Sequence, residues 1–524
     1  HTRCREVSWA RRCVYETGSV MKTGAAGPGR GVPHDMRDES CPACAESVSD
    51  HQNDVDTWIA CSHCSTWYHV MCVRLTNWDD YDKWYCQTCR DSLPLEPKMR
   101  APRRRSHRAR PTTDYAAVQE GKPSDPIGRW TSLLAQYKDW PVRVLRVEGS
   151  TWTSQWLSTS LEPLISPTLV PASATQDLDN PASHIPGMRM PPRHTTIRDV
   201  AQLVGPDTHV EVIDVRTQMS SRAWTLSMWA DYFETPVAKR DKLLNVISLE
   251  ITGTAMQRMV EAPAMVREND WVERDWPMHR RPCHADDEAR KWPKVQRYVL
   301  MGVQGAFTDF HIDFAGTWVY YHVVWGHKMF LFAPPTSANL ASYKAWTLSA
   351  QQESEWLGDR LQQLTKVEIR TGETMLIPPG WIHAVYTYQD TLVIGGNFLT
   401  DHDVAMHWRI EQMEGATHVP RKFRFPHLVR LAWYVAYAWH KRLSHGTSAP
   451  PPRVMEGIAQ LCKRLEQDVA KMETLPSASK GYKAAWDAVP RDVIRDPRAL
   501  LQEMQAHCKS HNVPHKRQRR HYER

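Results

Sequence analysis

Two histidines and one aspartate have the types and spacing of an iron site. His311 and Asp313 lie in the run TDFHID (308–313), and His383 follows the turn in IPPGWIHAVYT (377–387). Residues i and i+2 of a strand point to the same side, so we expect His311 and Asp313 to project from one face. Two histidines and a carboxylate on a β scaffold form the facial triad that holds Fe(II) and leaves coordination positions open. The alternative is a surface strand end with a hydrogen-bonded histidine.

Two further polar residues near this triad could bind a small anion. Lys328 lies in the run GHKMFLF, among large apolar residues. A buried ammonium without a counter-charge costs free energy, so we expect it to pair with a carboxylate of a bound substrate. Thr308 comes three residues before His311, at the same strand end, and can add a hydroxyl. This set of polar groups has the size of a 2-oxoglutarate site.

A second group of metal-binding residue types lies near the N-terminus. Most of the 12 cysteines fall between residues 41 and 89, in CxxC pairs. Each pair places two thiolates on one ion, and four half-sites close two tetrahedral zinc ions without an open position. So small a segment needs the metal for its stability. The eight predicted zinc ligands are Cys41, Cys44, Cys61, Cys64, His69, Cys72, Cys86 and Cys89.

The chain has 524 residues, too many for one compact core, so several domains are expected. The run PKMRAPRRRSHRARP (97–111) is rich in proline and arginine and indicates a solvated linker. Period-two patterns over 296–399 predict strands, and residues 454–472 have helical spacing. The predicted segments are a poorly determined N-terminus (1–37), a zinc finger (38–92), a basic linker (93–125), a bracing segment (126–251), a catalytic barrel domain (252–415), a helical region (416–510) and a basic tail (511–524).

Charge and hydropathy argue against a membrane or secreted protein. The longest strongly apolar stretch, LAWYVAYAW (431–439), is too short to span a bilayer. The N-terminal residues lack the charged-then-apolar pattern of a secretion signal. The formal net charge is +7, and the linker arginines could neutralise DNA phosphates or direct nuclear import. A solvated linker with no partner is the alternative, and no pattern indicates an oligomeric state.

The N-terminal segment resembles a PHD finger, whose eight-ligand spacing it matches in full. In that family the pairs alternate, which implies one zinc ion on Cys41, Cys44, His69 and Cys72 and the other on Cys61, Cys64, Cys86 and Cys89. Many PHD fingers bind histone tails and hold methyl-lysine in an aromatic cage. Trp58 and Trp67 stand where such fingers carry cage residues, although Trp67 could instead pack the small core. Ser40 occupies a position that is often aromatic in strong readers.

Four motifs, in the family's order, resemble the JmjC domain of a histone lysine demethylase. They are NVISLEITGT (245–254), TDFHIDFAGTWVYYHVVWGHKMFLFAPP (308–335), IPPGWIHAVYT (377–387) and LVIGGNFL (392–399). Together with the finger, they make the chain most similar to the fungal JmjC-domain-containing histone demethylation protein 1 family. The resemblance implies a multidomain fold. A small two-zinc PHD finger would precede a double-stranded β-helix, a jelly-roll, cupin-like JmjC barrel with flanking α-helices.

The resemblance also implies roles for single residues. The implied Fe(II) ligands are His311, Asp313 and His383. The implied partners of the distal carboxylate of 2-oxoglutarate are Thr308 and Lys328. Further groups around this cosubstrate would be Tyr321, Asn245 and Asn397. The chain departs from the family at Ala315, where glycine is usual, and at Tyr320, where tryptophan is usual, and these departures bear on substrate preference.

The activity implied by the resemblance is oxidative demethylation. Fe(II), 2-oxoglutarate and O2 would serve to remove methyl groups from dimethyl- or monomethyl-lysine at position 36 of histone H3, with release of formaldehyde and succinate. Two Zn(II) ions would stabilise the finger. The partner would be the methylated H3 tail of a nucleosome, and the location the nucleus. Two alternatives stay open: a catalytically silent chromatin reader or scaffold, and a protein hydroxylase of the same superfamily.

Overall fold

The computed structural model divides the chain into two compact units, one formed by residues 16–122 and the other by residues 1–15 and 123–524. The residues that the structure describes are 42–43, 58–70, 72–73, 75, 81–99, 144–173, 180–215, 220–281, 292–350, 352, 355–445 and 450–510. The predicted N-terminal stretch 1–37, most of the basic linker and the tail 511–524 lie outside these residues.

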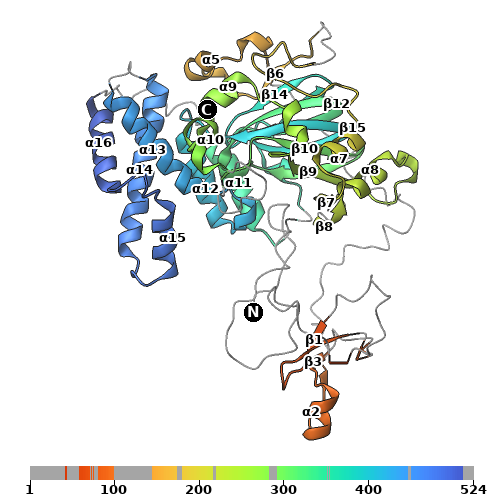
Figure 1. Cartoon of the computed structure of the whole chain (residues 1–524). Coiled ribbons are helices and arrows are strands. Elements are labelled where there is room, and N and C mark those ends of the chain that lie inside the picture. The colour runs from red at the N-terminus through yellow and green to blue at the C-terminus, as the bar shows by residue number, and fades with distance from the viewer. Residues whose placement is uncertain are drawn as a thin grey trace. The chain divides into compact units, whose positions relative to one another are not determined.

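The smaller unit holds two short β-ribbons and a helix among its described residues (Figure 1). Strands β1 (Trp58–Ala60) and β2 (Trp67–His69) pair antiparallel, as do β3 (Tyr81–Lys83) and β4 (Lys98–Met99). Helix α2 (Gln87–Ser92) lies between β3 and β4 in the chain. The paired backbone thus extends past the predicted finger boundary at residue 92. Among the described residues of this unit, the large buried side chains are Ile59, Tyr68, Val70 and Trp84.

The larger unit is built on one mixed sheet, which has 11 strands among the described residues. The strands are β5 (Leu145–Arg146), β6 (Thr168–Val170), β7 (His209–Asp214), β8 (Ser220–Thr225), β9 (Leu244–Glu250), β10 (Tyr298–Gly302), β11 (Phe307–His311), β12 (Trp318–Ala333), β13 (Thr365–Arg370), β14 (Thr374–Ile377) and β15 (Ile382–Phe398). Their order is β5-β6-β14-β12-β15-β10-β9-β7-β8, while β11 pairs with β15 and β13 with β12. Strands β5 to β9, from the predicted bracing segment, therefore join the same sheet.

The long strands β12 and β15 form the centre of this sheet and pair antiparallel along most of their length. Their register shifts between Val323 and Lys328, and such irregularities let a strand bend and serve both walls of a rolled sheet. The shift also reverses which residues face the interior. Before it the odd-numbered Val319 and Tyr321 belong to the core around the central cavity, and after it the even-numbered Phe330 does. Period-two patterning thus holds on each side of the shift but not across it.

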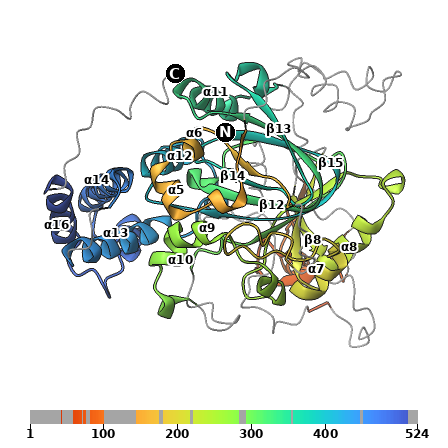
Figure 2. The same cartoon turned by 90° about the horizontal axis from the view of Figure 1, so that it is seen from above.

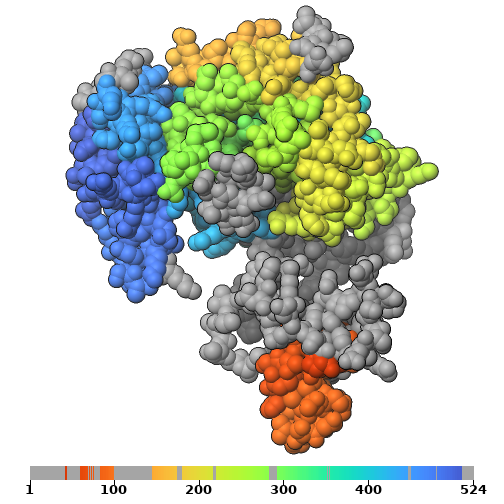
Figure 3. All heavy atoms as spheres, in the orientation of Figure 1, coloured from red at the N-terminus to blue at the C-terminus, as the bar shows by residue number. Residues whose placement is uncertain are grey.

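Helices flank the sheet on several sides (Figures 1 and 2). In the larger unit the described α-helices are α5 (Ser154–Thr159), α6 (Glu162–Ile165), α7 (Ile197–Val204), α8 (Leu226–Glu234), α9 (Ala264–Asn269), α10 (Trp271–Asp275), α11 (Ser337–Leu348), α12 (Val404–Ala416), α13 (Leu428–Ser444), α14 (Pro452–Thr474), α15 (Lys480–Ala488) and α16 (Pro497–Ser510). Helices α13, α14 and α16 share a second apolar core with α10. In the space-filling view α13–α16 form a continuous body at one side of the larger unit (Figure 3).

The large mixed sheet, its flanking helices and the cysteine cluster of the smaller unit confirm the predicted fold class. The rolled sheet corresponds to the expected jelly-roll, and flanking helices are present, α13–α16 among them. Among the described residues no helix combines the length and the apolar character that crossing a membrane would need.

Candidate metal centre and cosubstrate pocket

The two histidines of the predicted triad face each other across neighbouring strands. β11 ends at His311, and His383 is its direct partner on β15. The two ring centroids are 4.2 Å apart. Nδ1 of His311 donates to the Asp309 carbonyl at 2.8 Å, and Nδ1 of His383 donates to the Trp381 carbonyl at 3.1 Å. Because a carbonyl only accepts, each neutral ring carries an unprotonated Nε2, which is the form that binds a metal.

The third residue of the triad, Asp313, does not lie on the strand. It follows the end of β11 and precedes the short 3-10 turn η6 (Phe314–Gly316). The prediction that His311 and Asp313 share one strand face is therefore wrong, because the chain leaves the sheet between them. The two side chains still converge. Asp313 Oδ2 lies 3.8 Å from His383 Nε2, and ligand atoms of all three residues lie within 4.8 Å of one another.

The electrostatics of the cluster suit a divalent cation. Burial lowers the pKa of His383 well below its ordinary value, and the neighbouring His311 lowers it further. Burial also raises the pKa of Asp313, against the opposing effects of His311 and of a hydrogen bond from Asn397. Two imidazoles and a carboxylate are the donor set that a non-heme iron site uses. The residues present therefore fit an iron ion.

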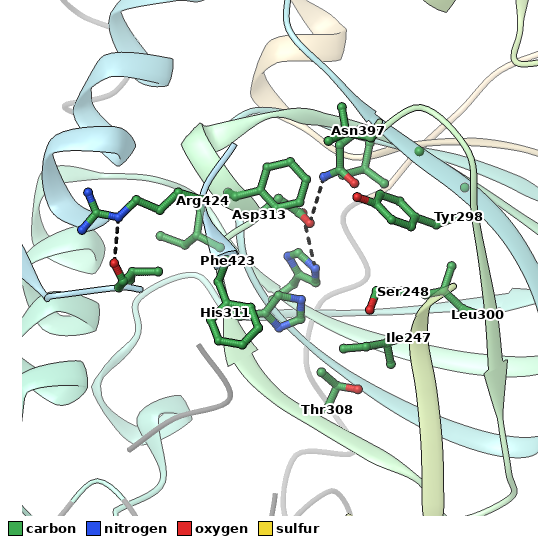
Figure 4. A pocket seen from close by; sticks show the side chains of 18 of the residues that line it. Ile247, Ser248, Tyr298, Leu300, Thr308, His311, Asp313, Asn397, Phe423 and Arg424 are labelled. Atoms are coloured by element: carbon green, nitrogen blue, oxygen red, sulfur yellow. Dashed lines mark hydrogen bonds and ion pairs between the residues drawn. The ribbon is translucent and has the colours of Figure 1, made fainter. Parts of the chain in front are cut away.

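A cavity of about 510 Å³ lies beside the three residues. Figure 4 shows Thr308, Ile247 and Ser248 on one side of His311, and Phe423 and Arg424 on the other. The predicted site residues that line this cavity are Thr308, His311, Asp313, Tyr321, Lys328, His383 and Asn397. The structure thus brings together in one cavity residues that the sequence spreads over 90 positions, from 308 to 397.

Lys328 is buried in the cavity wall, where it has a hydrogen bond but no counter-charge among the described residues. Lys328 is 4% exposed, and its Nζ donates a hydrogen bond to Thr387 Oγ1 at 2.9 Å. Burial alone lowers the pKa of Lys328 to about 7. A Cβ at Gly302 would lie 2.8 Å from Nζ, so glycine at that position makes room for the ammonium. An anionic group of a bound molecule would offset the cost of burying this charge.

Asn245 supports the cavity without lining it. Its Nδ2 donates to Thr308 Oγ1 at 3.4 Å, so it orients the threonine hydroxyl from β9. Its Oδ1 is buried and has no hydrogen-bond partner among the described residues. Asn397 Nδ2 donates to Asp313 Oδ1 at 3.3 Å and to Thr317 Oγ1 at 2.8 Å, which places it beside the metal cluster. Tyr321 lies on the wall, and burial raises the pKa of its phenol.

Sequence reasoning missed Thr387 and Gly302, the two residues that accommodate Lys328. Thr387 lies four residues after His383 on the same strand, so the period of two puts both side chains on one face. That spacing was a usable signal. Gly302 carries no comparable signal, because a lone glycine in a strand is equally compatible with a bulge or an edge.

In the smaller unit, four of the eight predicted zinc ligands come together. Side-chain sulfurs within 4.8 Å of one another belong to Cys61, Cys64, Cys86 and Cys89. Sγ of Cys64 lies 3.8 Å from Sγ of Cys86, and the backbone N–H of Cys86 donates to Sγ of Cys61 at 3.3 Å. Four sulfurs with no open position are the donor set of a structural zinc ion. The arrangement fits the alternating pairs expected of the finger.

The other predicted ligands and the predicted cage are only partly described. Cys41 and Cys44 lie outside the described residues, and of His69 only the backbone is described, in β2. Cys72 is half-buried. Trp67 is half-buried on β2, and the side chain of Trp58 on β1 lies outside the described part. The second zinc ion and the aromatic cage therefore stay predictions.

Comparisons with known proteins point to one family. The family model described as "JmjC domain, hydroxylase" matches residues 298–398. The chain is 47% identical over 504 residues to the JmjC domain-containing histone demethylation protein 1 of Mycosarcoma maydis, covering 84% of this chain and 75% of that protein. It is 38% identical over 409 residues to the protein of the same name from Yarrowia lipolytica, covering 75% of this chain and 74% of that protein.

An animal relative matches over a shorter stretch. The chain is 46% identical over 253 residues to the mouse lysine-specific demethylase 2B, which covers 48% of this chain and 19% of that protein. The family match at 298–398 spans β10 to β15, and therefore all three residues of the metal cluster.

Proposed function

The chain belongs to the JmjC domain-containing histone demethylation protein 1 family, and we propose that it demethylates dimethyl- and monomethyl-lysine at position 36 of histone H3. Its relatives are named histone demethylases, so the chain is a JmjC-type dioxygenase whose implied substrate is a histone. The lysine position and the methylation state are the finer part of this proposal. One observation supports the proposed chemistry: the two histidines and the aspartate open on a cavity that also holds a buried lysine.

In this proposal Nε2 of His311, Nε2 of His383 and the carboxylate of Asp313 would hold Fe(II). When bound there, iron supplies the oxidising chemistry that removes hydrogen from an N-methyl group at the expense of O2 and 2-oxoglutarate. The chain's own residues fix the ligands. The hydrogen bonds from Nδ1 to the backbone set both ring orientations, and Asn397 holds one oxygen of Asp313. Three protein ligands leave the remaining positions open for the cosubstrate.

The cosubstrate would lie in the same cavity. The ammonium of Lys328 would pair with the distal carboxylate of 2-oxoglutarate, and the Thr308 hydroxyl, oriented by Asn245, would donate to it. Tyr321 would form part of the wall against which the carbon chain lies. The apolar strands around the cavity would exclude water from the reacting methyl group and so limit side reactions.

Lys328→Met is expected to raise the KM for 2-oxoglutarate on the order of tenfold to a hundredfold, because a charge-assisted contact to a carboxylate contributes about 1.5–3 kcal/mol. Succinate formation measured across a 2-oxoglutarate titration checks this. Lys366→Met is the matched control. Lys366 lies on the neighbouring strand β13 and pairs with Glu368 at 3.3 Å outside the cavity, so its replacement leaves the KM unchanged. An unchanged KM in Lys328→Met would show that this ammonium does not bind the cosubstrate.

In the absence of 2-oxoglutarate, Lys328→Met should stabilise the folded enzyme. Its stability therefore distinguishes weaker cosubstrate binding from a loss of folding. Burial lowers the pKa of Lys328 from 10.5 to about 7, so the folded state binds this proton less tightly than the unfolded state. The destabilisation of the folded state by the buried ammonium is fully present below pH 7. It decreases as the pH rises toward 10.5. We therefore expect Lys328→Met to raise the Tm, and to raise it more at pH 7 than at pH 9. A lowered Tm at both pH values would contradict this account.

The finger would hold two Zn(II) ions and bind the histone tail. In this proposal Cys61, Cys64, Cys86 and Cys89 hold one ion, which the clustered sulfurs support. The other ion would be held by Cys41, Cys44, His69 and Cys72. Trp58 and Trp67, on the paired strands β1 and β2, would form two walls of a methyl-lysine cage.

The cellular setting follows from the relatives. Histone demethylase relatives imply a nuclear, chromatin-associated protein. The methylated H3 tail within a nucleosome would be the partner, and the arginines of the linker 93–125 would add non-specific contacts with DNA phosphates.

A panel of histone peptides tests the proposed site and methylation state. The full chain is incubated with Fe(II), 2-oxoglutarate and peptides that are mono-, di- or trimethylated at single lysines, and products are read by mass spectrometry. We expect stepwise loss of methyl groups from dimethyl- and monomethyl-lysine at position 36. Demethylation at another lysine would contradict the assigned position. A product that gains oxygen and keeps every methyl group would indicate a hydroxylase.

A further inference from the structure

The turn that follows Asp313 has a conformation that its sequence disfavours. Ala315 has φ 50° and ψ 24°, and Gly316 has φ 54°, so both residues are in the left-handed region. Glycine adopts this region readily, whereas alanine is strained there. Ala315 is also fully buried, so its backbone N–H needs an acceptor within the protein. The surrounding structure must therefore hold this turn.

Helix α12 provides the contacts that do so. His407, Ile410 and Glu414 are three and four residues apart and lie on one face of the helix. Glu414 Oε1 accepts the N–H of Ala315 at 2.7 Å, and His407 Nδ1 donates to the Gly316 carbonyl at 2.8 Å. A Cβ at Gly316 would lie 2.8 Å from Ile410 Cγ1, so the helix packs directly on the backbone of the turn.

Asp313 depends on this turn, while the histidines depend on the sheet. His311 and His383 are fixed by pairing between β11 and β15. Asp313 lies beyond the end of β11, and its carbonyl accepts the N–H of Gly316 at 2.9 Å. Its side-chain contact with Asn397, at 3.3 Å, is longer than the usual hydrogen bond to a carboxylate. The direction of the Asp313 carboxylate therefore follows the position of the turn.

We propose that Glu414 is a positioning residue for Asp313: by accepting the N–H of Ala315, it holds the turn that aims the aspartate at the metal. The inference rests on the proposed function in one respect, that the triad binds iron. Glu414 lines the same cavity and is 8% exposed, and its Oε2 has no hydrogen-bond partner among the described residues. Its Oε1 remains an acceptor whether or not the acid is ionised.

Two variants of similar size separate the acceptor from the packing. Glu414→Gln keeps an oxygen that can accept the Ala315 N–H, whereas Glu414→Leu fills the buried site without an acceptor. Fe(II) is titrated anaerobically into the iron-free full chain by calorimetry, without cosubstrate or peptide, and the signal of a His383→Ala variant is subtracted. We expect Glu414→Leu to weaken Fe(II) binding about 10- to 100-fold, as loss of a residue that orients a ligand does. Glu414→Gln should bind close to wild type.

A second substitution in the turn tests positioning against general destabilisation. Ala315→Gly removes the strain of the left-handed alanine. The turn then depends less on the hydrogen bond to Glu414 for its conformation. We expect Ala315→Gly to recover part of the Fe(II) affinity lost in Glu414→Leu, a recovery that a merely destabilised helix would not give. Glu411→Leu is the matched control on α12, because the Glu411 carboxylate pairs with Arg464 at 2.8 Å and not with the turn. It should keep wild-type Fe(II) affinity.

The outcomes are separable. Wild-type Fe(II) affinity in folded Glu414→Leu, or equal loss in Glu411→Leu, would overturn the role of Glu414 and leave the proposed function intact. Failure of the wild type to bind Fe(II) through His383 would overturn both. If circular dichroism shows that Glu414→Leu does not fold, Glu414→Ala takes its place under the same expectations.

Discussion

Alanine in place of His383 is expected to abolish 2-oxoglutarate-dependent demethylation and leave the barrel folded. His383 provides one of three ligand atoms that lie within 4.8 Å of one another, and two ligands cannot fix the open face of the metal. Its replacement removes no strand pairing, because the ladder between β11 and β15 is made by the backbone. We expect residual demethylation below about a tenth of the wild-type rate. Formaldehyde release and circular dichroism measure the two quantities.

The same outcome is expected for His311→Ala and Asp313→Ala. His209→Ala is the matched control, because His209 lies on β7 of the same sheet, is exposed and does not line the cavity. It should keep wild-type activity. Demethylation well above about a tenth of the wild-type rate in folded His383→Ala would contradict the assignment of this residue to the metal centre.

Removal of zinc is expected to unfold the finger. Among the described residues its buried core consists of a few side chains, such as Ile59, Tyr68 and Trp84, and so small a core does not offset the conformational entropy of the segment. Structural zinc contributes roughly 10–16 kcal/mol in comparable fingers, so it supplies most of the stability. A fragment of residues 38–99 should lose its circular dichroism signal and its dispersed NMR spectrum when a chelator is added, and should regain both with zinc.

Two cysteine substitutions test which residues bind the zinc. Cys86→Ser should lower the zinc content of the full chain, because Cys86 belongs to the sulfur cluster. Cys508→Ser is the control, since Cys508 lies on α16 of the larger unit and outside that cluster. A fragment that keeps its spectra in excess chelator would contradict a zinc-dependent finger.

Much of the site could be predicted because it depends on residue types and on short spacings. Pairs such as Cys61 and Cys64, or His311 and Asp313, are close in sequence, so their meeting at one ion needs little knowledge of the fold. Lys328 was recognisable because a charge among large apolar residues requires a partner. The strands of 296–399 were recognisable from their period-two pattern.

The other features of the site depend on contacts between distant residues, which local sequence patterns do not specify. Asp313 was expected on a strand, yet the chain leaves the sheet after His311, and a break at one residue cannot be read from composition. The register shift within β12 reverses the facing of its side chains, and it is set by packing against β15. Glu414 lies 99 residues from Ala315, to which it is hydrogen-bonded, so no local pattern connects the two.

Product stoichiometry tests most directly whether the metal cluster performs demethylation. The wild-type chain, supplied with Fe(II) and 2-oxoglutarate, is given an H3 peptide dimethylated at lysine 36, and formaldehyde and succinate are counted together. We predict formaldehyde formed in proportion to methyl groups lost, with succinate formation strongly stimulated by the methylated peptide and both absent in Asp313→Ala. Succinate formed without formaldehyde, or formaldehyde at wild-type yield from Asp313→Ala, would contradict the account.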